Sequence, residues 1–205
     1  MGKRILKVVA FCMLLFGVVA GMSRLVERKE SRQKMQPFLD HAGEYDVLFL
    51  GDSIMNTGVF PMEMWEKYGI AGYNIASYGN TLPITYWALQ NALDYAKPKL
   101  VVLDVQGVSK SYKLSGNSSD VHTAFDCYSI SKTKIEALDD LMDDPNAVDD
   151  DGVAYVDMKW EYLFTLGKYH ARWSELTDTD FHPVYNREKG AKSVIAVADV
   201  GDYDL

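Results

Sequence analysis

Three short apolar segments alternate with two helical patterns between residues 46 and 105. Val47–Leu50 is a continuous apolar run between polar residues, which is typical of a strand covered on both faces. Tyr73–Ala76 and Lys99–Val105 are predicted as the second and third strands. Strands that alternate with helices along a chain form a parallel sheet with helices on its faces. The sequence therefore predicts an α/β domain.

The two connections in this region carry helix signals. Pro61–Tyr68 begins with proline at its first position and is followed by Gly69. A second helix is predicted from Leu82-Pro83, with apolar residues at helical spacing until Lys97-Pro98 stops it. Both fit the crossover between neighbouring parallel strands.

The rest of the chain is less regular. Gly107–Tyr128 is polar and is predicted as a long loop. Thr133-x-x-Glu136 has the pattern of a capping box at the head of a helix. Met158–Leu176 is rich in aromatic residues and is predicted as one long helix, and Val194–Val197 as a last strand.

The N-terminal segment, residues 1–22, is a candidate membrane anchor. Ile5–Met22 is apolar apart from Lys7, and its eighteen residues are near the lower limit for crossing a bilayer. A cleaved signal peptide has a similar pattern and is the competing interpretation. Basic residues occur on both sides, so their count does not orient the segment. The simpler arrangement is a single-pass protein of the cell membrane, with a short inner tail and the domain outside.

Residues 23–44 are charged and are predicted as a helical stalk or linker, whose apolar residues cover one edge of the domain. The domain itself is assigned to residues 45–205.

Charge and cysteine content exclude some functions. The formal net charge of the 205 residues is −8, which argues against nucleic acid as a partner. Cys12 and Cys127 are far apart, and no Cys/His cluster has the spacing of a zinc site. The acidic turn region Asp143–Gly152 lacks the order of a calcium loop and is predicted to be solvated. We expect no metal and no organic cofactor. Oligomeric state is left open.

Gly51-Asp52-Ser53 directly follows the first predicted strand, and Gly79 follows the second. Open α/β sheets bind ligands outside the carboxyl ends of their strands. Near a helix start, Ser53 would have backbone N–H groups that can receive an oxyanion. The alternative is that Asp52 or Ser53 only caps the helix.

These residues resemble the SGNH/GDSL hydrolase superfamily, above all its membrane-anchored bacterial members. The resemblance rests on Val47–Ser53, Asn74–Asn80 and Lys99–Val105. It implies a three-layer α/β/α, flavodoxin-like parallel sheet. It also implies an esterase or O-acyltransferase in which Ser53 is the nucleophile and the N–H groups of Ser53 and Gly79 form the oxyanion hole. The implied substrate is an acylated small molecule or an acylated glycan of the bacterial cell envelope.

Two further family blocks are altered in this chain. Where the family has Gly-x-Asn after the third strand, this sequence has Val105-Gln106-Gly107-Val108-Ser109, so Gln106 or Ser109 is the substitute oxyanion donor. The family's terminal Asp-x-x-His is also absent. Of the four histidines, His182 is the C-terminal one with carboxylates beside it, and it becomes the candidate base with Asp180 as its orienting residue.

Three explanations stay open for the missing block. His182 serves as the base, or the chain lacks a C-terminal portion that complete relatives have, or the protein is a non-catalytic relative. In the last case the protein is an anchored binding or assembly protein, and the aromatic segment and acidic loop are its partner surfaces. Without a base, a serine hydroxyl is a poor nucleophile at neutral pH.

Overall fold

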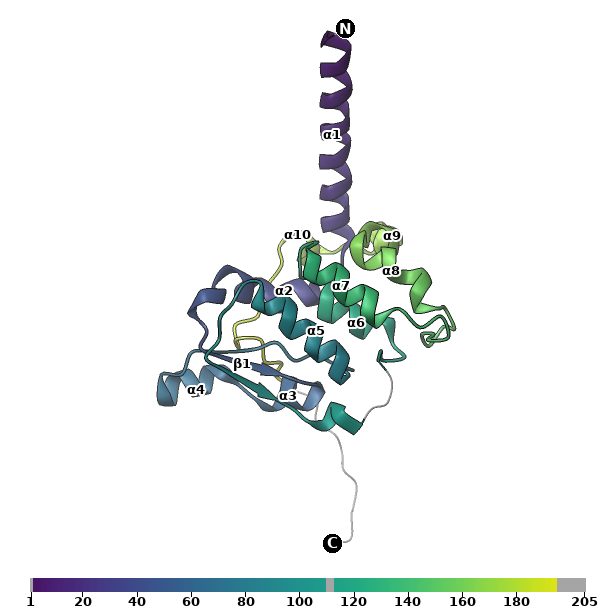
Figure 1. Ribbon diagram of the computed structural model, residues 1–205. Coiled ribbons are helices and arrows are strands. Elements are labelled where there is room, and N and C mark those ends of the chain that lie inside the picture. Colours follow the sequence, from purple (N-terminus) through teal and green to yellow (C-terminus); the bar gives the residue numbers. More distant parts are fainter. Residues whose placement is uncertain (1, 110–112, 195–205) are drawn as a thin grey trace.

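A three-stranded parallel sheet lies on the side of the domain away from the N-terminal helix in the computed structural model, which describes residues 2–109 and 113–194 (Figure 1). Its strand order is β2-β1-β3. The central strand β1 (Val47–Leu50) has the predicted bounds, whereas β2 (Gly72–Asn74) and β3 (Leu100–Leu103) are shorter than predicted. In the register, Leu48 lies opposite Tyr73 on β2 and Val101 on β3. The predicted mixed α/β class and parallel sheet are confirmed.

Alternate residues of β1 point to opposite sides of the sheet, and side chains of helices pack against them on each side. Leu48 and Leu50 belong to the larger core cluster, with side chains of five helices: α2 (Lys29–Asp40), α5 (Leu82–Leu93), α6 (Ser118–Phe125), α7 (Lys132–Leu141) and α8 (Tyr155–Leu163). Val47 and Phe49 pack in a smaller cluster with α3 (Ser53–Gly58) and α4 (Pro61–Tyr68). The predicted helix 61–68 is confirmed.

The N-terminal helix α1 (Gly2–Val26) projects from the domain (Figure 1). An 18-residue window in it has a mean hydropathy of 2.4 and is 0% buried, so α1 is long and apolar enough to cross a membrane. Its last turns contact α9 (Thr165–Tyr169) and the 3-10 helix η3 (His170–Glu175). There the hydroxyl groups of Ser23 and Thr165 form a hydrogen bond of 2.8 Å, and the Arg172 guanidinium donates to the carbonyl of Val26 at 2.6 Å.

The charged segment after α1 is packed into the domain. It contains α2 and the short η1 (Ala42–Glu44), and Met35, Phe38 and Ala42 are buried in the larger core cluster. The predicted covering of one edge by apolar residues of this segment is thus observed. Residues 23–44 share the core of the domain rather than standing apart from it.

The prediction of a continuous loop over 107–128 is wrong. This region includes η2 (Gln106–Ser109) and α6, whose start is capped by the Asn117 side chain accepting from the N–H of Ser119 at 2.9 Å. The N-cap of the following helix α7 lies two residues before Thr133, the N-cap of the predicted capping box. This N-cap is Ser131, whose hydroxyl accepts from the N–H of Lys134 at 3.0 Å.

The single helix predicted for Met158–Leu176 is also wrong. The chain breaks at Phe164, where φ is −127° and ψ is 79°, and the segment continues as α9 and η3. Tyr162 and Tyr169 turn into the core, whereas Trp160, Phe164 and Trp173 are exposed. A short helix α10 (Asp178–Phe181) follows. Of the strand predicted at Val194–Val197, only Val194 is among the residues that the structure describes.

The two edges of the sheet differ. Next to β2, the chain near residue 189 lies alongside the strand, where the N–H of Asn74 donates to the carbonyl of Lys189 at 2.8 Å. In the part of the chain that the structure describes, β3 pairs with β1 alone. Leu100 and Leu103 of β3 are 55% and 43% exposed, which is unusual in parallel sheets because their strands are normally covered on both faces.

Candidate functional site

Ser53 lies at the carboxyl end of β1 and is the first residue of α3. The chain leaves the strand through Gly51, whose φ is +148°. A side chain at this position would overlap the Cβ of Asp104, just beyond β3, so the exit needs glycine for both conformation and space. The side chain of Ser53 is partly exposed. The sequence predicts Ser53 at the end of a strand, and the structure places it there, after the central strand β1.

The segment after β2 reaches the same edge of the sheet. The carbonyl of Gly51 accepts from the N–H of Ser77 and from the side-chain amide of Asn80, each at 3.2 Å. Gly79 lies between Ser77 and Asn80 in the sequence, and its φ of +64° is in the left-handed region. The structure thus brings the Ser53 and Gly79 segments together through one shared carbonyl.

The electrostatics of this edge are acidic. The N–H of Ser53 donates to the Asp52 carboxylate at 2.6 Å, so Asp52 caps α3. Gly79 lies against the carboxylate of Asp120 on α6, which a Cβ at Gly79 would overlap. Burial raises the pKa of Asp120, a hydrogen bond from Ser115 partly offsets this rise, and the Asp52 carboxylate adds to it. An oxyanion at this edge would lie near the carboxylates of Asp52 and Asp120. The Asp52 carboxylate already accepts from the N–H of Ser53, which is one of the two predicted oxyanion donors.

The third predicted oxyanion group lies in η2, after β3. Gln106 is exposed, and its backbone N–H donates to the Asp104 carboxylate at 2.9 Å. The side chain of Ser109 lies outside the described part of the structure.

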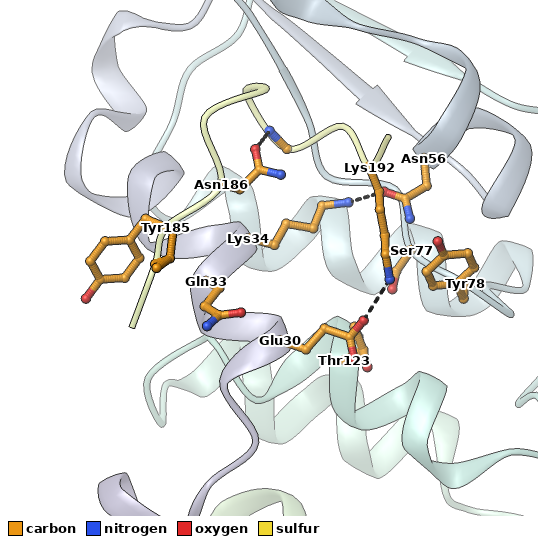
Figure 2. Close-up of a pocket in the computed structure, with 12 residues that line it drawn as sticks. Glu30, Gln33, Lys34, Asn56, Ser77, Tyr78, Thr123, Tyr185, Asn186 and Lys192 are labelled. Atoms are coloured by element: carbon orange, nitrogen blue, oxygen red, sulfur yellow. Dashed lines mark hydrogen bonds and ion pairs between the residues drawn. The ribbon is translucent and has the colours of Figure 1, made fainter. Parts of the chain in front are cut away.

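A pocket of about 450 Å³ adjoins α3, and sequence reasoning missed it (Figure 2). Asn56 from α3 and Ser77 from the segment before Gly79 contribute to its wall, together with Lys34 from α2. The Lys34 ammonium donates to the side-chain oxygen of Asn56 at 2.7 Å and to the carbonyl of Ala76. Burial lowers the pKa of Lys34 to about 7. Only the tertiary fold brings this lysine to the carboxyl edge, because it precedes the first strand in the sequence.

The structure does not bring His182 to Ser53. His182 follows α10, near the end of α1, whereas α3 lies on the far side of the sheet (Figure 1). Its ring is exposed and lies 4.0 Å from Asp178. Asp180, its predicted orienting residue, instead pairs with Arg172 at 3.1 Å and accepts from the N–H of Thr177 at 2.9 Å. Asp180 is thus close to His182 in the sequence because it belongs to the capping box at the start of α10.

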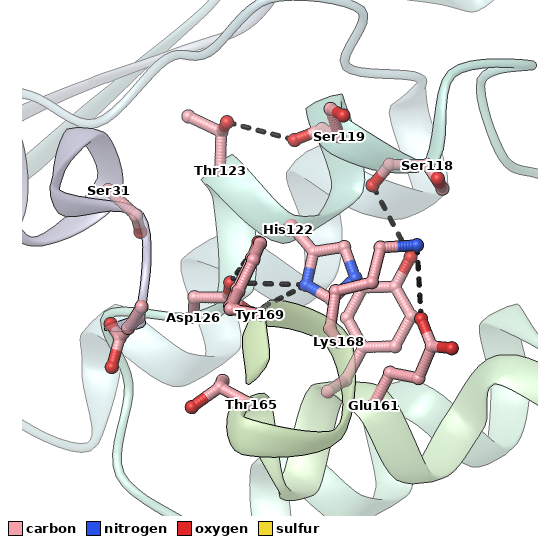
Figure 3. Close-up of polar contacts among 12 residues, drawn as sticks. Ser31, Ser118, Ser119, His122, Thr123, Asp126, Glu161, Thr165, Lys168 and Tyr169 are labelled. Atoms are coloured by element: carbon pink, nitrogen blue, oxygen red, sulfur yellow. Dashed lines mark hydrogen bonds and ion pairs between the residues drawn. The ribbon is translucent and has the colours of Figure 1, made fainter. Parts of the chain in front are cut away.

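A buried His–Asp pair does exist elsewhere, on α6 (Figure 3). His122 Nδ1 and Asp126 Oδ1 are 2.9 Å apart, and Tyr169 donates to Asp126 Oδ2 at 3.0 Å. The imidazole stacks on Tyr162 with ring centroids 3.9 Å apart, and its Nε2 has no hydrogen-bond partner among the described residues. His122 was assigned to a polar loop; its spacing of four from Asp126 is the signal that indicates a helical pair.

The two remaining histidines are exposed and have local partners. His41 pairs with Glu44 at 3.2 Å, and His170 contacts the carbonyl of Gly167 at 2.8 Å. Among the described residues, no group of three His, Cys, Asp or Glu side chains is placed to hold a metal ion. In comparisons with known proteins, no family model, no curated protein and no solved structure matches this chain.

Proposed function

We propose that this chain is a membrane-anchored, SGNH-type serine esterase or O-acyltransferase in which Ser53 is the nucleophile. The observation that carries the proposal is the exit from β1: Gly51 in a backbone conformation suited to glycine, then Ser53 at the head of α3, with the Gly79 segment bound to the same carbonyl. Serine nucleophiles of α/β hydrolytic enzymes are displayed at such strand-to-helix turns.

The sheet order supports the same proposal. The order β2-β1-β3 is that of the first three strands in a flavodoxin-like sheet of order 2-1-3-4-5. In such folds the ligand lies beyond the carboxyl ends of the strands, where Ser53 and Gly79 are. The open side of β3 is where a fourth strand of this order would pair.

The proposed reaction has two steps. Ser53 Oγ attacks the ester carbonyl and forms the acyl-serine bond, the ester C–O bond breaks, and the departing alkoxide takes the hydroxyl proton and leaves as the alcohol. Water or a second alcohol then takes the acyl group from Ser53. For the oxyanion to form, the Ser53 N–H must turn from Asp52 to the substrate. The substrate class we propose is an acyl ester of a small molecule or of a cell-envelope glycan.

The location that we propose is supported by α1, which is long and apolar enough to cross a membrane. The helix crosses the membrane once and is retained, and the domain lies on the extracytoplasmic side. In this arrangement the contacts of α9 and η3 with the end of α1 hold the domain close to the bilayer surface.

A second function is favoured by one observation. Among the described residues, the hydrogen bonds and ion pairs of the four histidines are all with groups other than Ser53, and the Ser53 N–H is taken up by the Asp52 cap. A non-catalytic, anchored binding or assembly protein of the same fold fits this arrangement without further change.

Ester hydrolysis distinguishes the two. The full chain in detergent is assayed with 4-nitrophenyl acetate, beside Ser53→Ala and the matched control Ser174→Ala, which changes an exposed serine on η3. The enzyme proposal predicts turnover above the buffer rate that Ser53→Ala abolishes and Ser174→Ala retains. Equal rates in all three proteins would support the binding protein.

A further inference from the structure

Lys34 presents an ammonium group without an acidic partner to the pocket shown in Figure 2. Its two hydrogen-bond acceptors, the Asn56 side-chain oxygen and the Ala76 carbonyl, are both neutral. No carboxylate among the described residues forms an ion pair with it, and an ammonium has three N–H groups, so one donor is left. A partly buried cation in this state is stabilised by any anion that reaches it.

A second lysine adds positive charge to the same pocket. Lys192 pairs with Glu30 of α2 at 3.1 Å and lies over the ring of Tyr78, 4.8 Å from its centroid. The wall therefore holds two lysines and one carboxylate, which gives one net positive charge when Lys34 is protonated. This balance suits a monoanion better than a dianion such as phosphate.

The other walls are uncharged and partly apolar. Tyr78, Val184 and Tyr185 supply aromatic and aliphatic surface, and Gln33 and Ser77 supply an amide and a hydroxyl. A volume of about 450 Å³ is within the range of small-molecule sites, whose walls are mostly apolar with a few polar groups that fix orientation. The occupant thus needs an organic body as well as a negative charge.

We infer that this pocket binds a small organic monocarboxylate, whose carboxylate pairs with Lys34 and whose apolar part packs on Tyr78. The site goes beyond the proposed function, because binding at Lys34 uses neither Ser53 nor an ester. Its nearness to the Ser53 edge follows from Asn56, which lies one turn after Ser53 on α3.

Binding at this site is coupled to pH. Burial, the main cause, and Lys192 lower the pKa of Lys34, whereas Glu30 raises it. Cys127, also near, is a neutral thiol at these pH values because burial raises its pKa to about 12. Tyr73 faces the backbone carbonyl of Lys34 as a neutral phenol, since burial raises its pKa as well. The ammonium is thus the group that titrates near neutral pH, and the carboxylate binds its protonated form.

Calorimetry with benzoate, and with benzamide as its neutral analogue, tests the inference on the full chain in detergent. We expect benzoate to bind at pH 6 and its affinity to fall about tenfold or more by pH 8.5, where most Lys34 has lost its proton. Benzamide should bind at least tenfold more weakly than benzoate at pH 6. Benzoate affinity equal to that of benzamide, or unchanged between the two pH values, would overturn the inference.

Variants assign the effect to the pocket. Lys34→Met should abolish the preference for benzoate, with the circular dichroism spectrum of the fold retained, whereas Lys67→Met, on an exposed lysine of α4, should keep it. Ser53→Ala should bind benzoate as the wild type does, which separates this site from the proposed esterase. Retained preference in Lys34→Met, or inorganic phosphate binding more tightly than benzoate, would contradict the inference.

Discussion

The backbone N–H of Ser53 donates a 2.6 Å hydrogen bond to the carboxylate of Asp52, the residue before it. This contact caps α3 and fixes the exit from β1, but it also occupies the N–H that an acyl-transfer site would turn to its oxyanion. Asp52 therefore stabilises the start of α3, and the same hydrogen bond hinders the use of the Ser53 N–H as an oxyanion donor. A bound ester would have to compete with the Asp52 carboxylate for this donor.

Neutralising the second carboxylate of this edge should raise the reactivity of Ser53. Asp120 lies against Gly79, and an anion forming between Ser53 and Gly79 is repelled by its charge. We expect Asp120→Asn to react several-fold faster with a fluorophosphonate than the wild type, measured as the rate of covalent labelling. Asp94→Asn, at the exposed end of α5, is the control and should react at the wild-type rate. Slower labelling of Asp120→Asn would give Asp120 a positive role in the reaction.

Gly51→Ala should destabilise the domain by more than about 2 kcal/mol, because the new Cβ adopts an unfavourable φ and overlaps Asp104. Gly58→Ala, at the end of α3, meets no atom and should change stability by less than about 0.5 kcal/mol. Urea unfolding followed by tryptophan fluorescence measures both. Equal midpoints for the two variants would show that the turn at Gly51 is not formed as described.

The His122–Asp126 pair should be a stability element rather than a catalytic one. His122→Ala leaves the buried Asp126 carboxylate with Tyr169 as its side-chain donor and removes the stacking on Tyr162, at an expected cost of about 3–5 kcal/mol. His41→Ala, which breaks an exposed pair with Glu44, should cost less than about 0.5 kcal/mol. Thermal unfolding of the two variants compares them. A small loss in His122→Ala would mean that the pair is solvated in solution.

The stability of the protein should rise with pH just above neutrality because of Lys34. The pKa of Lys34 is about 7 in the folded protein and ordinarily 10.5, so the unfolded chain binds more protons between these two pH values. Folding then becomes more favourable by up to about 1.4 kcal/mol per pH unit as pH rises from 7 to 8.5. Above about pH 9 the raised pKa of Cys127 opposes this trend. Unfolding free energies of wild type and Lys34→Met measure the slope, which the variant should lack.

Local signals sufficed for the elements of the sheet region. The apolar run 47–50 and the helix 61–68, with proline at its first position and glycine after it, have the predicted bounds because burial on both faces and end signals act within a few residues. In contrast, α6 follows a Gly- and Ser-containing stretch, and its buried face, with Val121 and Phe125, was not recognised behind those loop residues.

The candidate site shows the same division. Ser53 was predicted from the end of a strand, a local feature, and the approach of the Gly79 segment followed from the expectation of a parallel sheet. Lys34 could not be predicted, because its place beside Asn56 depends on the packing of α2 across the core. His182 was favoured for its neighbouring carboxylates, yet Asp180 serves in a capping box that holds α10. The closeness of Asp180 and His182 in the sequence therefore did not indicate that they lie near Ser53.

Covalent labelling of Ser53 tests the central claim most directly. The full chain in detergent is treated with a fluorophosphonate probe, digested and analysed by mass spectrometry, beside Ser53→Ala and Ser77→Ala, which removes the nearby pocket serine. If Ser53 is the nucleophile, a phosphonate adduct forms on the peptide that contains Ser53, in the wild type and in Ser77→Ala, and is absent from Ser53→Ala. No adduct on that peptide at saturating probe, in protein with a native unfolding transition, would contradict the assignment of Ser53 as a nucleophile.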